Sequence, residues 1–151
     1  MVTEIRRVRP VDEPILANVA PDVFDGPIVP DRLAAFVSDP SHCLVVAIDG
    51  DLVVGQAAAI VHRHPDLPSE LYVDNLGVTP SHRREGVGRR LLDALLAWGG
   101  EQGCEEAWVG TEHDNEPARA LYASYSAEAE PFVLFFLTWP RPPERSRAPE
   151  K

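Results

Sequence analysis

Hydrophobic and polar positions repeat with two different periods along the chain, and each change of period marks a new element. Alternation of apolar and charged residues from Ile5 to Arg9 predicts a half-buried first strand. Apolar residues then recur at helical spacing, first from an N-cap at Asp12 up to Pro21 and again from Asp31 up to Asp39. The N-terminal part therefore predicts a strand followed by two short helices.

The middle of the chain is rich in β-forming residues. The runs Leu44–Ile48 and Leu52–Val61 flank the turn Asp49-Gly50-Asp51, which predicts an antiparallel hairpin. A further strand is predicted over Glu70–Val78, where Gly77 indicates a bulge or a close approach of another backbone.

A long amphipathic helix is predicted over Gly86–Gln102, weakened near its end by Gly99-Gly100. After it we expect a strand over Glu106–Thr111, a helix capped by Asn115, and a last apolar strand over Phe132–Trp139. This order of elements predicts the α/β (α+β) class, with a mixed, mostly antiparallel sheet and helices on both faces.

Length and composition indicate one domain of residues 1–139 with a disordered polar tail over residues 140–151. Cys43 and Cys104 belong to no C-x-x-C pattern, which favours a reducing compartment. No apolar leader and no membrane-length apolar run is visible, so we expect a cytoplasmic protein. The formal net charge of −10 disfavours nucleic acid and membrane partners and favours cationic ones, unless it serves solubility alone.

The most specific local pattern is a loop with Gly86 and Gly88 that follows a strand and opens the long helix. Backbone N–H groups at such a helix start can bind phosphate when glycines let the ligand approach. Four arginines gather there in an otherwise acidic chain, namely Arg83, Arg84, Arg89 and Arg90. The alternative is an exposed, arginine-rich helix start. A dinucleotide fingerprint is disfavoured because Leu91 stands where G-x-G-x-x-G needs glycine, and G-K-[ST] is absent.

Two segments resemble the signatures of the GCN5-related N-acetyltransferase (GNAT) superfamily. Arg83-Arg84-Glu85-Gly86-Val87-Gly88 is similar to its pyrophosphate loop, and Asn115-x-x-Ala118-x-x-Leu121-Tyr122 is similar to its second signature. Within the superfamily, Glu70–Val78 and Asn115–Tyr122 most resemble the aminoglycoside 3-N-acetyltransferase-like branch.

The resemblance implies a GNAT fold in which acetyl-CoA lies where the sheet splays apart. Pantetheine would pair with the backbone of Leu76 and Val78, and the N–H of Val78 would face the thioester carbonyl as an oxyanion donor. The cofactor-binding residues that it implies are Leu76, Val78, Arg83, Arg84, Gly86, Val87, Gly88, Arg89, Asn115, Ala118 and Tyr122.

The resemblance also implies that Tyr122 is the general acid for the leaving thiolate, whereas its alternative role is to pack on the core. The attacking amine must lose a proton, and Asp74 and Glu70 lie on one face of the predicted strand as candidates for the base. Glu112 is a third acidic candidate, and ordinary solvated carboxylates are the alternative.

Two smaller patterns carry other chemistry. His62-x-His64 places two imidazoles on one strand face, but a metal site needs a further ligand, so a substrate-binding loop or simple surface residues are favoured and no metal is expected. Ser81-His82 has no evident acid partner and no nucleophile elbow, so we do not expect a nucleophilic serine.

The chain departs from the superfamily pattern after Tyr122. Ser126 stands where glycine is expected at a left-handed helix end, at a cost of about 1 kcal/mol. This change puts the local geometry in question, and Tyr125 offers a second phenol near the predicted acid.

Taken together, these patterns predict an acetyl-CoA-dependent transfer to a primary amine of a small cationic molecule, aminoglycoside-like or polyamine-like. The alternatives are a protein or peptide N-acetyltransferase and a non-catalytic acyl-CoA sensor. The apolar run Phe132–Trp139 suggests a core strand or the edge of a homodimer.

Overall fold

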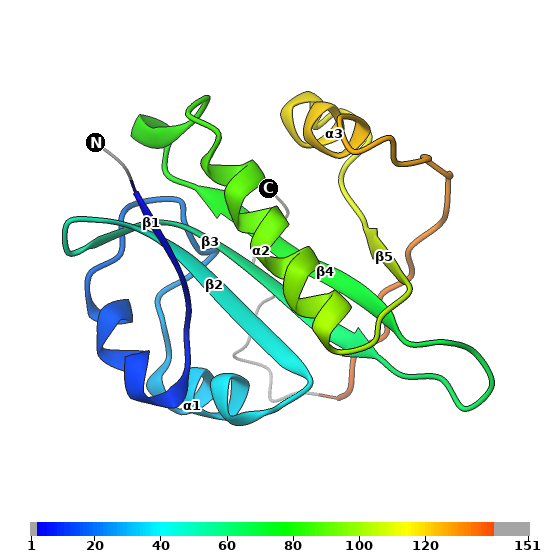
Figure 1. Cartoon of the computed structure of the whole chain (residues 1–151), viewed down its shortest axis with the longest axis horizontal. Coiled ribbons are helices and arrows are strands. Elements are labelled where there is room, and N and C mark those ends of the chain that lie inside the picture. Colours follow the sequence, from blue (N-terminus) through cyan, green and yellow to red (C-terminus); the bar gives the residue numbers. More distant parts are fainter. Residues whose placement is uncertain (1–2, 141–151) are drawn as a thin grey trace.

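Five strands form one sheet, in the order β1-β2-β3-β4-β5, in the computed structural model, which describes residues 3–140 (Figure 1). Strands β1 to β4 pair antiparallel with their sequence neighbours, whereas β4 and β5 are parallel. This mixed, mostly antiparallel sheet confirms the predicted fold class. The strands span Glu4–Arg7, His42–Asp49, Leu52–His62, Glu70–Val78 and Glu106–Val109.

Helices cover both faces of the sheet. Helix α2 (Val87–Glu101) crosses one face diagonally, and its fully buried Leu91 and Leu95 pack against β2, β3 and β4 (Figure 1). The 3₁₀ helix η1 (Pro10–Ala17) and α1 (Pro30–Ser38) cover the other face over β2 and β3. The remaining helices are η2 (Pro80–His82) and α3 (Glu116–Ala123). Burying each large apolar side chain contributes about 1.5–3 kcal/mol, so these two layers hold the sheet rigid.

Two glycines, one in α2 and one in β4, allow other segments of the chain to pack closely against β4. A Cβ at Gly99 of α2 would lie 2.9 Å from Leu71 Cδ2, so this glycine lets the helix settle on the strand. A Cβ at Gly77 would lie 2.4 Å from the carbonyl oxygen of Val23, which confirms the close backbone approach expected there. That carbonyl accepts a hydrogen bond of 3.2 Å from the buried Gln56 side chain. The loop that contains Val23 is thus fastened to β3 and β4.

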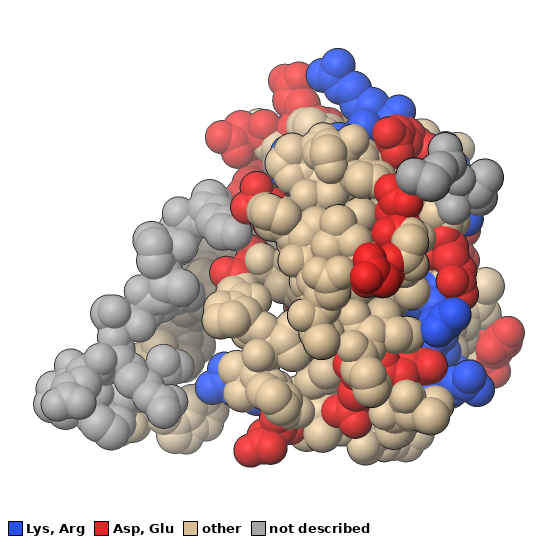
Figure 2. Space-filling view, turned by 90° about the vertical axis from the view of Figure 1, so that its left-hand side faces the viewer, with Lys and Arg blue, Asp and Glu red and all other residues tan. Residues whose placement is uncertain are grey.

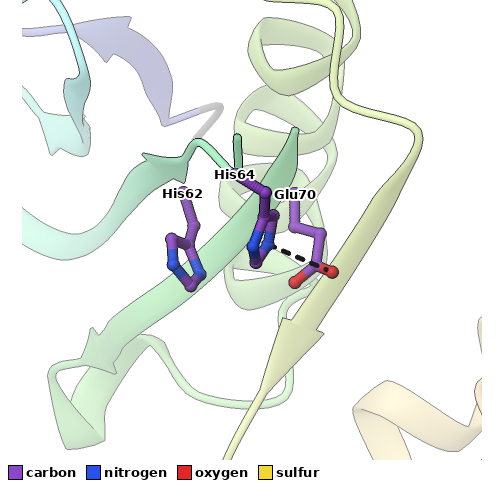
Figure 3. Close-up of side chains that lie close together, drawn as sticks. All are labelled: His62, His64 and Glu70. Atoms are coloured by element: carbon purple, nitrogen blue, oxygen red, sulfur yellow. Dashed lines mark ion pairs between the residues drawn. The ribbon is translucent and has the colours of Figure 1, made fainter. Parts of the chain in front are cut away.

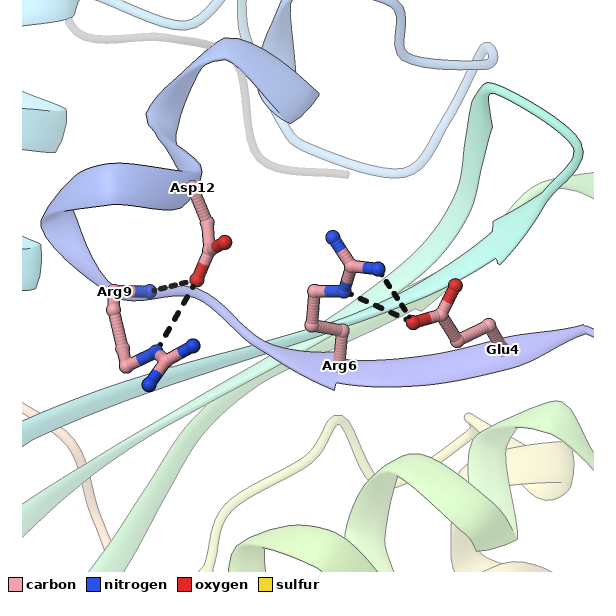
Figure 4. Close-up of polar contacts among 4 residues, drawn as sticks. All are labelled: Glu4, Arg6, Arg9 and Asp12. Carbon is pink, nitrogen blue, oxygen red and sulfur yellow. Dashed lines mark hydrogen bonds and ion pairs between the residues drawn. The ribbon is translucent and has the colours of Figure 1, made fainter.

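The chain departs from the expected elements near the N-terminus. Strand β1 ends at Arg7 instead of Arg9, and the next element is a 3₁₀ helix with Arg9 as its N-cap, so Asp12 is not the N-cap. Pro14 lies inside this helix and lacks the N–H that an α-helix needs, which explains the tighter form. Asp12 instead accepts the Arg9 backbone N–H at 3.0 Å (Figure 4). This hydrogen bond lowers the pKa of the Asp12 carboxyl.

The predicted strand over Phe132–Trp139 is wrong. Residues 127–140 form no helix or strand, and the apolar side chains of the segment are 59–83% exposed. Strand β5 also ends at Val109, two residues earlier than expected. A strand needs a neighbour for its backbone hydrogen bonds, and β propensity alone does not supply one. The homodimer edge stays a prediction, and residues 141–151 of the expected tail lie outside the described residues.

Acidic side chains are scattered over the face of the molecule drawn in Figure 2, with a few basic ones at its edges. Among residues 3–140, no helix combines the length and the apolar character needed to cross a bilayer.

Replacing Gly77 by alanine is expected to lower the free energy of unfolding by about 2–3 kcal/mol, because the new methyl group collides with a backbone oxygen. Gly100→Ala is the matched control: a Cβ there meets nothing within 4 Å, and the change should stabilise α2 by up to about 1 kcal/mol. Urea denaturation measures both. Equal stability of the two variants would contradict the close approach.

Candidate active site

Strand β4 separates from β5 halfway along its length. The parallel pairing runs from Glu70 opposite Glu106 to Val73 opposite Val109 and then stops, while β4 continues to Val78. At the point of separation β4 bulges, because Asn75 and Val73 pair with successive β3 residues and leave Asp74 without a partner. The upper half of β4 therefore has a neighbour on the β3 side alone within the described sheet (Figure 1).

Within residues 3–140, the backbone N–H groups of this half-strand on the side away from β3 have no neighbouring strand to pair with. Thr79 N–H donates to Val54 of β3 at 2.8 Å, and N–H directions alternate along a strand. The N–H groups of Leu76 and Val78 therefore point away from β3 into the gap. The Val78 carbonyl, on the same side, accepts a hydrogen bond of 3.0 Å from Arg83 Nε.

The loop that follows β4 leaves backbone N–H groups at the start of α2 available to an anion. Gly86 is the N-cap and has φ 80°, a left-handed conformation that glycine adopts without strain. No side chain of residues 3–140 caps this end, so the first-turn N–H groups lack acceptors from the protein. The space around Gly86 is open, since a Cβ there would meet nothing within 4 Å. The geometry fits a phosphate, which both the free N–H groups and the helix dipole favour.

The arginines of this turn make different contacts. Arg83 bonds to the strand end, as described above, and Arg90 donates two hydrogen bonds of 2.8 Å to Thr3 of the N-terminal segment. Arg89 bonds to Ser124 and lies 4.5 Å above the Tyr125 ring. All four arginines are exposed, and Arg84, whose φ is 65°, is the one of them that makes no hydrogen bond or ion pair within residues 3–140.

The two phenols near this region differ in their surroundings. Tyr122 on α3 is half-buried against the core that α2 forms with the sheet, and burial raises the pKa of its hydroxyl. Tyr125 donates a hydrogen bond of 2.5 Å to Asp93, and burial together with this bond raises its pKa to about 12. The Tyr125 hydroxyl is therefore engaged on the side of α2. The helix that carries Tyr122 begins as predicted, with Asn115 accepting the Ala118 N–H at 3.2 Å.

On the sheet face opposite α2, β4 and β5 present a cluster of aromatic and acidic side chains. Leu71 and Val73 are buried toward α2, so Glu70, Tyr72 and Asp74 point the other way. Tyr72 stacks on Trp108 with ring centroids 4.3 Å apart. Burial, and then the neighbouring Asp74 carboxylate, raise the pKa of the Tyr72 hydroxyl.

The sequence analysis did not identify the two aromatic residues of this cluster. Strand alternation alone could have placed Tyr72 beside Asp74, but finding Trp108 required the register of β4 against β5. Glu112, the third acidic candidate, lies in the loop after β5, beyond the end of that strand at Val109.

His82 has an acid partner that was not evident in the sequence. Its Nε2 lies 2.8 Å from Asp49 Oδ2 at the end of β2, and its Nδ1 lies 2.8 Å from Ser81 Oγ. These contacts join η2 to the β2–β3 turn. They fix the segment that leads from Val78 to the glycine loop.

The comparisons with known proteins agree with this geometry. Residues 13–126 match the model of the acetyltransferase (GNAT) family. The chain belongs to the GNAT family. This stretch contains the splayed strand, the glycine loop and α3, and the GNAT fold predicted above is confirmed.

Proteins with several different names are similar in sequence to this GNAT chain. A Mycobacterium leprae protein is 35% identical over 127 residues, which are 82% of this chain and 34% of that protein. The N-alpha-acetyltransferase RimI of Mycobacterium tuberculosis is 35% identical over 105 residues, covering 68% of this chain and 62% of RimI. The chain thus spans about a third of the first relative and less than two thirds of the second.

Solved structures share the fold of this GNAT chain. The aminoglycoside acetyltransferase AAC(6′)-Iy, in complex with a bisubstrate analogue of CoA and acetylneamine, superposes with a TM-score of 0.76 at 20% identity. The match covers 91% of this chain and 99% of that one. The 3-N branch suggested by the sequence stays a prediction.

Ser126 occupies a left-handed backbone conformation with φ 59°, as the departure from the glycine pattern predicted. Ser126→Gly is expected to raise the free energy of unfolding by about 1 kcal/mol, because glycine adopts this conformation without strain. The matched control Ala123→Gly, in the last turn of α3, should lower it by about 1 kcal/mol. Thermal denaturation measures both, and a destabilised Ser126→Gly would contradict the strain.

Proposed function

We propose that this protein transfers the acetyl group of acetyl-CoA directly to a primary amine of a small cationic molecule. The observation that carries the proposal is the half-strand from Asn75 to Val78, whose outward N–H groups face a gap that begins at the end of the β4–β5 pairing. An extended, amide-containing arm such as pantetheine can pair there as an added strand. The glycine loop lies at the far end of the same half-strand.

Acetyl-CoA in this gap would have its pyrophosphate at the first-turn N–H groups of α2 and its thioester near Val78. The cofactor supplies the activated acetyl group. The N–H of Val78 is then a preorganised donor for the oxyanion that forms on the thioester carbonyl, and one such donor contributes about 2.7–4 kcal/mol. Of the arginines in the loop, Arg84 is the best placed to meet a phosphate, because its exposed side chain is adjacent to the open Gly86 turn.

Tyr122 is the proposed general acid. Its raised pKa keeps the hydroxyl protonated at neutral pH, so it can donate a proton to the leaving thiolate. Tyr125 is the less suitable phenol, because its hydroxyl already donates to Asp93.

The amine is proposed to approach from the face opposite α2, over the cluster formed by β4 and β5. Stacked Tyr72 and Trp108 offer aromatic surface, and Asp74 and Glu70 offer negative charge, which together attract a cationic amine. Asp74 lies at the bulge where the strands separate, so it is the carboxylate nearest the reacting end and the first candidate for the base. The AAC(6′)-Iy complex and its aminoglycoside analogue support a small polyamine-like acceptor.

Acetylation of a protein N-terminus is the second candidate, favoured by the identity with RimI. The two functions differ in the acceptor alone, so a panel of both classes separates them.

Arg84→Glu is expected to weaken acetyl-CoA binding about tenfold, because the reversal places a negative charge beside the pyrophosphate. Arg32→Glu on α1 is the control, since it changes the net charge equally on the opposite face of the sheet and should leave the affinity within about twofold. Calorimetric titration with acetyl-CoA measures both. The proposed cofactor site is wrong if wild-type protein shows no binding.

Tyr122→Phe should lower kcat by about a hundredfold at unchanged KM for acetyl-CoA, because a general acid contributes at least that much. Tyr125→Phe is the matched control and should retain kcat, since its hydroxyl bonds only to the α2 side. Release of CoA thiol is followed with aminoglycosides, polyamines and N-terminal peptides as acceptors. Asp74→Asn should reduce turnover of the cationic amines as well. No thiol release above hydrolysis with any amine would favour a non-catalytic acyl-CoA sensor.

A further inference from the structure

The loop end of the β3–β4 hairpin brings two histidines and a glutamate together. His62 is the last residue of β3 and pairs in register with Glu70, the first residue of β4, and His64 lies two residues further along. The two imidazole rings have centroids 4.2 Å apart, and His64 Nε2 lies 3.5 Å from Glu70 Oε1. Figure 3 shows both rings and the carboxylate on the same side of the hairpin. One nitrogen or oxygen from each residue lies within 4.8 Å of the others.

The nitrogen at the centre of this group lacks a hydrogen bond. His64 Nε2 is buried and makes no hydrogen bond to residues 3–140, although Glu70 Oε1 lies 3.5 Å away, within ion-pair distance. A buried nitrogen without a partner is costly. A cation between this nitrogen and the carboxylate would satisfy both groups.

We propose that His62, His64 and Glu70 bind a divalent transition-metal ion of the zinc class. Two imidazoles and one carboxylate suit Zn²⁺ and its neighbours, whereas Mg²⁺ and Ca²⁺ prefer all-oxygen sites. Tetrahedral ligands about 2.0–2.2 Å from zinc lie about 3.3–3.6 Å apart, so small side-chain rotations would bring the three ligand atoms to the spacing that zinc needs. His62 is exposed, which leaves an entry path and a fourth position for water or an external ligand.

The surrounding charge favours a cation. Glu106 of β5 is the register partner of Glu70 and adds an exposed carboxylate to the half-buried one at this end of the sheet. Arg63 lies between the two histidines in sequence, but its guanidinium is directed to Ser69 Oγ at 3.4 Å. Alternation along the chain places it away from the two imidazoles.

The ion would fasten the last residue of β3 to the first residue of β4 across the loop of residues 63–69. It would also hold the Glu70 carboxylate, which lies four residues, or about 13 Å, from Asp74 along the strand. The metal site shares Glu70 with the proposed acceptor surface but not Asp74 at the strand separation, so metal binding can be tested whether or not the proposed function is correct.

Zinc binding to the full chain tests the site, by calorimetric titration with Zn²⁺ and by the change in Tm that Zn²⁺ produces. Wild-type protein is expected to bind one equivalent tightly and to gain several degrees of Tm. His62→Ala and Glu70→Gln should each weaken binding at least about tenfold, because each removes one of three ligands. His113→Ala is the control: this histidine is exposed, lies outside the cluster and should leave binding unchanged.

Circular dichroism of the metal-free variants checks that each one folds, which is expected because His62 is exposed and glutamine preserves the shape of Glu70. Equal Zn²⁺ affinity in wild type, His62→Ala and Glu70→Gln would overturn the proposal. So would the absence of binding to wild type, or a loss in His113→Ala that matches the loss in the cluster variants.

Discussion

The early end of the β4–β5 pairing is the constraint on which the rest of the site depends. If the two strands paired along their full length, the N–H groups of Leu76 and Val78 would be used inside the sheet. The pairing stops at Val73 and Val109, yet β4 stays in place because β3, α2 and the loop near Val23 hold it from other sides. A rigid strand with one free edge results, and such an edge binds an extended ligand without the cost of ordering the protein first.

Basic and acidic side chains are concentrated in different parts of the structure. The chain carries a formal net charge of −10, but the turn that opens α2 concentrates arginines around free backbone N–H groups. Three of these arginines bond to other parts of the chain, namely Arg83 to the end of β4, Arg89 to Ser124 and Arg90 to Thr3. This leaves the backbone and Arg84 to meet an anion. On the opposite sheet face the carboxylates of β4 and β5 favour cations. In the proposed function, the sheet thus separates a surface for an anionic cofactor from one for cationic ligands.

Local patterns in the sequence predicted the parts of the site that depend on short-range geometry. The glycine loop, the Asn115 cap and the strained Ser126 are each determined by neighbours within a few residues, and each was found where expected. Contacts between distant segments were missed, such as Asp49 with His82 and Trp108 with Tyr72. These depend on the register of strand pairing, which a single sequence does not encode locally. The prediction of a strand over Phe132–Trp139 was wrong for a related reason: a high β propensity does not by itself provide a neighbouring strand to pair with.

The β3–β4 hairpin shows how strand register brings together side chains that are distant in sequence and can bind a ligand together. The sequence places His62 and His64 together but separates His62 from Glu70 by the loop of residues 63–69, in which His64 lies. The third ligand could therefore be found only once His62 was seen to pair with Glu70. The same strand then carries Glu70, Tyr72 and Asp74 on one face, from the hairpin end to the point where the sheet opens. A substitution at Glu70 should therefore act mainly on the histidine cluster, and it should affect the acceptor surface only through a charge effect that weakens with distance. A substitution at Asp74 should act at the point where the strands separate.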